Sequence, residues 1–167
     1  MISNLVTEAT LARFAKEVAK YPADQKQSAV MACLAIVQQE TGYVSAESEK
    51  IVADYLGMAP IAVHEVTTFY NMYNQHACGK YKLNVCTNLP CQLRDGGQAL
   101  KHLEEKLGIH MGETTPDGLF TLQQCECLGA CADSPVLLVN DRTMCSFMSN
   151  DKLDQLVDGL RASGDSQ

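Results

Sequence analysis

The sequence predicts an α+β protein, in which a small N-terminal helical bundle is followed by a β-α-β-β-β-α domain. Up to about residue 77 the apolar residues recur at helical spacing, whereas beyond that point they alternate as in strands and are separated by turn residues. We therefore expect a helical bundle and docking region at residues 1–77 and a second domain at 78–162. The last residues, 163–167, are polar and are expected to form a flexible tail.

Four short helices are expected in the first region, at about residues 8–20, 24–39, 45–57 and from Pro60 onward. Pro22 follows the first helix, and Ser45 is a suitable N-cap for the third. Proline is favoured at the first helical position, and the fourth helix is expected to bury Ile61, Val66 and Phe69. Short helices with short connections are typical of a small bundle.

The second region begins with a predicted strand at 81–86, where Tyr81, Leu83 and Val85 alternate with other residues. The elements expected after it are a helix at 95–107, a strand at 119–124, a hairpin of strands 135–140 and 143–148, and a helix at 150–161. A β-α-β crossover normally joins two parallel strands, and a hairpin adds an antiparallel pair. This order of strands and helices is that of a thioredoxin-like fold.

Composition excludes several classes of function. The net charge of −7 and a pI near 5.0 argue against a nucleic-acid partner, because phosphate binding needs a clustered cationic surface. No apolar run reaches the roughly 20 residues that cross a bilayer, and the N-terminus lacks the features of a signal peptide. We therefore expect a cytoplasmic protein with no direct membrane insertion. No phosphate-binding loop, dinucleotide fingerprint or catalytic triad is present, so a dinucleotide is not expected to bind this chain.

Eight cysteines are the most informative feature of the chain. In a reducing compartment, clustered cysteines more often bind metal or carry out redox chemistry than form disulfides. Cys86 and Cys91 fall at the end of the first predicted strand and in the loop after it, and Cys127 and Cys131 fall in the loop after the second strand. Because parallel strands end at the same edge of a sheet, these two loops should be neighbours. Four thiolates then meet at one point.

Spacing distinguishes the candidate occupants of such a site. Structural zinc sites mostly use C-x2-C pairs around one ion, whereas the C-x4-C and C-x3-C pairs here suit a wider two-iron cluster. Gly129, inside the second pair, would let backbone N–H groups approach the sulfurs. Unmetallated thiols and a zinc-stapled interaction module remain alternatives. A thiol–disulfide oxidoreductase normally requires C-x-x-C at the start of a helix, which neither pair provides.

The segments CTNLPC and CECLGACADSPVLLVN resemble the thioredoxin-like [2Fe-2S] ferredoxin subunits of bacterial respiratory complex I, the E subunits of NADH:quinone oxidoreductase. The segment VHEVTTFYNMY at 63–73 is similar to a segment of the same family that ends in T-F-Y. The resemblance extends over nearly the whole chain. It implies a [2Fe-2S] cluster with Cys86, Cys91, Cys127 and Cys131 as the ligands, and it leaves Cys125 as a bystander.

The resemblance also implies a function. The chain would be a subunit without a catalytic residue of its own, exchanging single electrons with the flavin of a partner that binds FMN and NADH. It would lie on the cytoplasmic face of the inner membrane, held there through the complex. The equivalent diaphorase subunit of an NAD-linked formate dehydrogenase or hydrogenase is the alternative.

The remaining candidates have less specific signals. Cys33 and Cys145 are expected to be core thiols, and Cys78 lies at the junction of the two regions. None of the four histidines lies in a cysteine loop, which argues against a Rieske-type centre. Arg94 either lies beside the cluster, where it would favour the reduced form, or is simply an exposed side chain. Aromatic residues at helical spacing are more often core than docking surface, and this applies to Phe69, Tyr70 and Tyr73.

Overall fold

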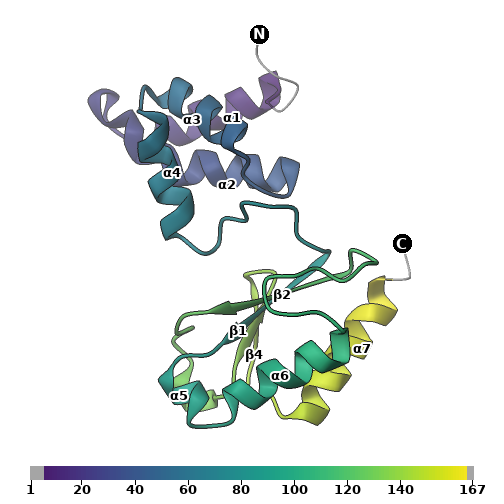
Figure 1. The fold of residues 1–167 in the computed structure, drawn as a ribbon. Coiled ribbons are helices and arrows are strands. Elements are labelled where there is room, and N and C mark those ends of the chain that lie inside the picture. The colour runs from purple at the N-terminus through teal and green to yellow at the C-terminus, as the bar shows by residue number, and fades with distance from the viewer. Residues whose placement is uncertain (1–5, 165–167) are drawn as a thin grey trace. The chain divides into compact units, whose positions relative to one another are not determined.

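The computed structural model describes residues 6–164, and the chain divides into two compact units between Ala77 and Cys78. The first unit is helical and the second is built on a four-stranded sheet (Figure 1). The order of elements is α+β, as predicted. Within residues 6–164, no helix combines the length and the apolar character that crossing a bilayer requires.

The first unit consists of one 3-10 and four α-helices. In chain order they are α1 (Glu8–Val18), η1 (Ala23–Ala29), α2 (Val30–Thr41), α3 (Ala46–Leu56) and α4 (Pro60–Phe69). Thr7 and Thr10 form a reciprocal capping box at the start of α1, and Ser45 caps α3. Helices α2 and α3 end at Gly42 and Gly57, both with positive φ, a conformation that glycine adopts without strain.

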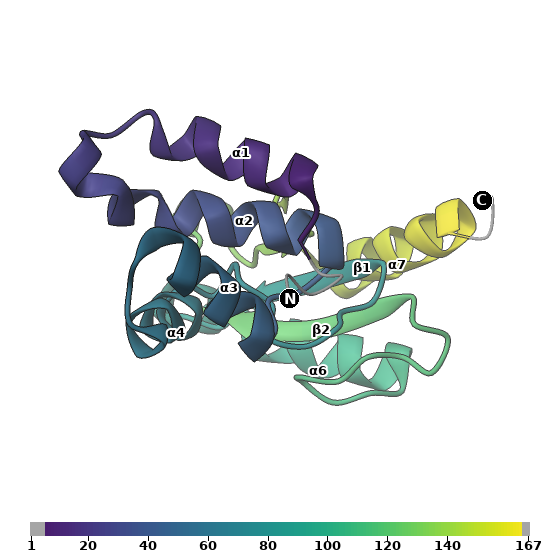
Figure 2. The ribbon, with the colours of Figure 1, turned by 90° about the horizontal axis from the view of Figure 1, so that it is seen from above.

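These helices bury one apolar core. Helix α1 runs alongside α2 (Figure 2). The largest fully buried side chains of this core come from four helices and one connecting loop: Phe14, Cys33, Leu34, Val37, Val44, Val52, Leu56 and Val63. The prediction that Cys33 is a core thiol is confirmed. Its burial, together with the charge of Glu17, raises the pKa of the Cys33 thiol to about 12.

The helix predicted at 24–39 is wrong over its first part. Residues Ala23–Ala29 form a 3-10 helix with a non-helical residue at Gln25, and the regular helix α2 starts only at Val30. The segment ADQKQSA buries only Ala29, so it has no apolar face that would hold it in a regular α-helix.

The predicted inner face of the fourth helix is partly wrong: Val66 packs against the core as expected, but Ile61 and Phe69 do not. Val63 and Thr67, four residues apart, point into the bundle, while Ile61 is 63% exposed and Phe69 is 79% exposed. Because residues four apart share one helix face, Ile61 and Phe69 are rotated away from the core. Tyr73 is buried as expected, and its hydroxyl donates to the carbonyl oxygen of Met31 at 2.8 Å.

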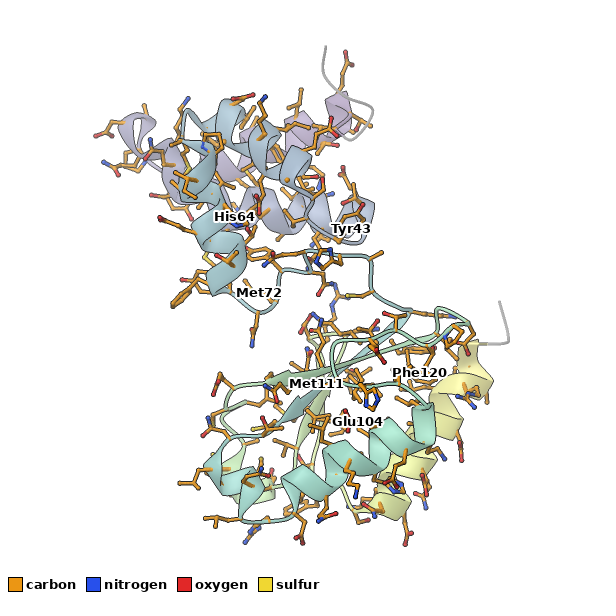
Figure 3. The ribbon with its side chains drawn as sticks, viewed as in Figure 1. Tyr43, His64, Met72, Glu104, Met111 and Phe120 are labelled. Atoms are coloured by element: carbon orange, nitrogen blue, oxygen red, sulfur yellow. The ribbon has the colours of Figure 1, made fainter. Side chains whose placement is uncertain are left out.

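Polar contacts tie α3 to α4 within this unit. The carboxylate of Glu49 is buried, and it accepts a hydrogen bond from the hydroxyl of Thr67 and contacts Nδ1 of His64 at 3.0 Å. Figure 3 shows His64 on α4 and Met72 in the segment that follows it. A buried carboxylate is costly unless it is hydrogen-bonded, so these contacts specify how the two helices pack.

The second unit contains a mixed sheet and its helices. Its elements are β1 (Tyr81–Cys86), α5 (Leu89–Gln92), α6 (Gly96–Leu107), β2 (Phe120–Cys125), η2 (Cys131–Asp133), β3 (Leu137–Val139), β4 (Thr143–Cys145) and α7 (Asn150–Gly164). The strand order is β2-β1-β3-β4, with β1 and β2 parallel and the other neighbouring pairs antiparallel. The predicted parallel crossover and antiparallel hairpin are thus confirmed.

Helices α6 and α7 lie side by side and cover one face of the sheet (Figure 1). Leu83 and Val85 of β1 face this layer, and the residues buried with them include Phe120, Leu122, Leu103, Leu153 and Val157. The opposite side of β1 is polar but also buried. Lys82, only 3% exposed, pairs with Asp141 at 2.6 Å, and Asn84 donates to the same carboxylate. Charge pairing makes the burial of Lys82 tolerable.

Several details of this unit differ from prediction. The hairpin strands are shorter than 135–140 and 143–148, because the N–H groups of Phe147 and Met148 bond to Asp133 and Pro135 instead of extending the ladder. Cys145 packs against the core of this unit, as predicted, but it is only partly buried. Helix α7 continues to Gly164, so residues 163 and 164 are helical, and the remainder of the predicted tail lies outside the described residues.

Candidate metal centre

The site begins where β1 and β2 end. The two parallel strands are paired in register, so that Cys86 and Cys125 are Cα partners at their last residues. Both loops that follow therefore leave the sheet at the same edge. The loop after β1 carries Cys91, and the loop after β2 carries Cys127 and Cys131.

The first loop contains a short helical turn, α5, that sequence analysis missed. The side chain of Asn88 accepts a hydrogen bond from the N–H of Leu89 at 3.0 Å, and Pro90 occupies the first turn. This turn folds the chain back so that the Cys91 thiol reaches the Cys86 thiol. Both cysteines are buried. An asparagine cap followed by an early proline is a helix-start signal that the sequence does contain.

The second loop holds the other pair of thiols. The sulfurs of Cys127 and Cys131 are 3.4 Å apart, and both cysteines are exposed. Gly129 lies between them with φ of +79°, and its N–H donates to the Cys127 sulfur at 3.4 Å. A left-handed backbone at this point is favourable for glycine, which explains why this residue suits the turn.

Hydrogen bonds from one loop reach the thiols of the other. Burial raises the pKa of Cys86, while the N–H groups of Asn88 and Leu128 act in the opposite direction. Burial also acts on Cys91, but its hydrogen bonds with the side chain of Ser134, the backbone of Val136 and the side chain of Cys86 outweigh it and hold the pKa of Cys91 below its ordinary value. The first pair of thiols therefore lies among donors supplied largely by the second loop.

Two side chains, those of Ser134 and Asn88, connect the loops. The hydroxyl of Ser134 donates to the carbonyl oxygen of Cys131 at 2.7 Å, and its oxygen is 3.4 Å from the Cys91 sulfur. Asn88 donates from its amide to the carboxylate of Glu126 at 2.8 Å. Neither contact was predicted from the sequence, because the partners are separated by about forty positions and belong to no motif.

Cys125 is near this group but differs from it. It is the last residue of β2, it is 8% exposed, and it lies in a small buried cluster with Cys86, Cys91 and Val136. Burial, followed by the neighbouring charge of Cys86, raises the pKa of Cys125 to about 12. It is therefore a neutral thiol beside Cys86 and is not part of the 127/131 pair.

His64 and His102 each contact a carboxylate outside the cysteine loops. His64 contacts Glu49 in the first unit, and His102 contacts Asp154 at 2.9 Å between α6 and α7. Across residues 6–164, no three His, Cys, Asp or Glu side chains converge in a way that would hold a single metal ion. The predicted thiols are instead brought together as two pairs, Cys86 with Cys91 and Cys127 with Cys131.

This donor set fits a two-iron cluster. Such a cluster takes four thiolates, two on each iron, and it is stabilised by N–H groups that point at the sulfurs. The two thiol pairs provide the four sulfurs, and the N–H of Gly129 points at one of them. Val136 and Leu128 add apolar side chains beside the buried pair. A model of the thioredoxin-like [2Fe-2S] ferredoxin family matches residues 14–161.

The chain belongs to the thioredoxin-like [2Fe-2S] ferredoxin family.

Relatives of this ferredoxin agree with that membership. It is 42% identical to the second subunit of the NADH-quinone oxidoreductase of Thermus thermophilus, over 86% of this chain and 80% of the relative. It is 38% identical to the E subunit of the NADH-quinone oxidoreductase of Rickettsia conorii, over 96% of both chains. A mitochondrial NADH dehydrogenase [ubiquinone] flavoprotein 2 of Dictyostelium discoideum is 41% identical over 81% of this chain, which spans 55% of that relative's length.

A similar fold occurs within a longer chain. A crystal structure of an NAD+-reducing [NiFe]-hydrogenase in its H2-reduced state superimposes on 80% of this chain with a TM-score of 0.68, at 18% sequence identity. The matched part is 22% of the hydrogenase chain. At this level of identity the likeness concerns the fold alone.

Proposed function

We propose that this ferredoxin is an electron-transfer subunit of an NADH:quinone oxidoreductase of the complex I type. The observation that carries the proposal is the gathering of four thiols, as two pairs, at the sheet edge where β1 and β2 end. The relatives that share about 40% of their residues with this chain are named as subunits of such oxidoreductases, which supports the assignment.

The proposed ligands are Cys86 and Cys91 for one iron and Cys127 and Cys131 for the other. The pairing follows the contacts, since the two thiols of each pair are close in the sequence and contact each other. When bound, a [2Fe-2S] cluster accepts and returns one electron at a time. The chain itself contributes position and shielding, and this role needs no acid–base residue.

The two thiol pairs differ in solvent exposure, so the site is open on one side only. Cys86 and Cys91 are buried against Val136, whereas Cys127 and Cys131 are open to solvent. A redox partner therefore approaches most closely at the 127/131 side. Leu89 and Leu93, next to Cys91, are both highly exposed and offer an apolar rim for such a contact.

The proposed partner is a subunit that binds FMN and NADH, and its flavin exchanges electrons with this chain. The helical unit, residues 1–77, is the proposed second docking region. Ile61, Phe69, Tyr70 and Met72 are exposed there, close together in the sequence. Exposed apolar clusters of this kind mark interaction sites more often than isolated apolar residues do. Through this complex the chain would be held at the cytoplasmic face of the inner membrane.

Low-temperature EPR of the purified, dithionite-reduced chain tests the proposal. We expect one spin-half signal and about two irons per chain. A protein that holds zinc in place of iron and gives no signal would contradict it. Identification of the subunits that co-purify with the chain separates a quinone oxidoreductase from the diaphorase unit of an NAD-linked formate dehydrogenase or hydrogenase.

A further inference from the structure

Arg94 connects the two cysteine loops through one side chain. It follows α5, and its backbone N–H donates to the carbonyl oxygen of Cys91 at 3.0 Å. Its guanidinium crosses to the other loop, where Nη1 donates to the carbonyl oxygen of Ala132 at 3.2 Å. Ala132 directly follows Cys131, so Arg94 is bonded beside one thiol of each pair.

The guanidinium is exposed, and its charge is not neutralised by a carboxylate. In the part of the chain that the structure describes, Arg94 forms no ion pair, unlike Arg13 with Glu40 or Lys82 with Asp141. A full positive charge therefore stands at the rim formed by Cys131 and Ala132. The guanidinium remains charged at any working pH.

We propose that Arg94 is a positioning residue of the iron–sulfur centre, which latches the two ligand loops together and holds the reduction potential of the bound cluster at a more positive value. This inference rests on the proposed ligand set. The C-x4-C and C-x3-C patterns identify only the cysteines, and they predict neither the hydrogen bond from Arg94 to Ala132 nor a positive charge beside the site.

The sign of the effect follows from charge. The cluster with four thiolates carries about −2 when oxidised and −3 when reduced. A nearby positive charge stabilises the more negative state, so removal of the charge makes reduction harder. Because Arg94 is exposed, salt screens its effect on the potential, whereas the hydrogen bond to Ala132 is affected much less.

Three variants separate these contributions. Arg94→Gln removes the positive charge and replaces the guanidinium with an amide on a shorter side chain. Arg94→Lys keeps the positive charge but loses the planar guanidinium group. Arg142→Gln is the matched control, because Arg142 is exposed in the β3–β4 turn, at the end of β3 away from the cysteine loops, and the change in net charge is the same. The readouts are the midpoint potential from an EPR-monitored redox titration and the rate of iron release to a chelator.

We expect Arg94→Gln to shift the midpoint to a more negative potential, and this difference from wild type to shrink at about 1 M salt. We expect Arg94→Lys to keep a midpoint near that of wild type, and both Arg94 variants to release iron faster. Arg142→Gln should match wild type in both measurements. A midpoint for Arg94→Gln equal to that of Arg142→Gln would overturn the proposal.

Two further outcomes are also decisive. If Arg94→Gln purifies without a cluster, the Arg94→Lys variant is measured instead. An unchanged rate of iron release in Arg94→Lys would then refute the proposal that Arg94 holds the two loops together. The wild-type EPR signal tests the proposed function independently. A normal signal with no effect at Arg94 refutes this inference alone, whereas absence of the signal in wild type refutes the cluster itself.

Discussion

Cys86 and Cys125 face each other as the last residues of two parallel strands, and both are buried. Their neighbours along the chain turn out of the sheet, so Cys86 meets Cys91 in one loop and Cys127 meets Cys131 in the other. Cys125 stays within the strand, where the backbone is held by the β1–β2 ladder. The chain leaves the sheet directly after Cys125, so Cys127, only two residues away, lies in the loop beside Cys131.

The first prediction concerns the choice between these two cysteines. Cys127→Ser should lose most of the roughly two irons per chain and the EPR signal, because one of four thiolates is removed. Cys125→Ser should keep both, since its thiol is not part of either pair. Iron analysis and EPR of the two purified variants measure this. Retention of iron in Cys127→Ser together with its loss in Cys125→Ser would reverse the assignment.

A second prediction follows from the pKa of Cys125, which burial raises to about 12. At pH 9 only about 0.1% of such a thiol is thiolate, the reactive form. We expect iodoacetamide to leave Cys125 unmodified at pH 7 to 9, both before and after removal of the cluster. The exposed Cys127 and Cys131 should become labelled once the cluster is removed. Mass spectrometry of the digested protein measures the extent of modification at each cysteine.

Denatured protein is the control for that experiment, since every cysteine should react there.

The raised pKa of Cys125 also predicts a loss of stability at high pH. Because the folded protein holds the Cys125 proton more tightly than the unfolded chain does, the contribution to the free energy of unfolding is present below about pH 8.5 and is lost as pH rises toward 12. Rapid labelling of Cys125 at pH 8 in the folded state would contradict its assigned environment.

Two adjacent glycines provide a third prediction. A Cβ at Gly96 would lie 2.8 Å from the carbonyl oxygen of Cys91, a backbone atom, whereas a Cβ at Gly97 would meet only the end of the Gln92 side chain. We expect Gly96→Ala to displace Cys91 and lower the iron content. Gly97→Ala should hold iron normally and gain up to about 1 kcal/mol of helix stability. Equal iron contents in the two variants would show that the first loop tolerates the displacement.

A fourth prediction uses the neighbouring threonines of α4. The hydroxyl of Thr67 donates to the buried carboxylate of Glu49, while that of Thr68 is exposed and bonds only to backbone carbonyls of its own helix. Thr67→Val should lower the free energy of unfolding by about 1–3 kcal/mol, since it leaves a buried carboxylate without one donor. Thr68→Val should change it by less than about 0.5 kcal/mol.

Urea unfolding followed by circular dichroism measures both threonine variants, with the midpoint of the transition of the helical unit as the readout. A loss of stability in Thr68→Val as large as that in Thr67→Val would indicate that helix propensity, and not the Glu49 contact, determines the result.

Short-range patterns in the amino-acid sequence were enough to predict the α+β order, the parallel β-α-β crossover, the antiparallel hairpin, and the position of two cysteine pairs at one sheet edge. Each of these depends on features that extend over a few residues: periodicity, turn residues and cysteine spacing. Local physical chemistry dictates such features, which is why they could be predicted without coordinates.

Long-range packing, by contrast, determines which contacts connect the two cysteine loops and which apolar side chains remain exposed. The bonds of Ser134 to Cys91 and of Arg94 to Ala132 join residues about forty positions apart, and their geometry depends on strand register and loop shape together. The exposure of Ile61 and Phe69 likewise depends on which face of α4 packs inward, a choice set by the burial of Val63 and Thr67 against the other helices. An apolar side chain is suited to burial, but only the packed chain determines whether a partner within the same unit covers it.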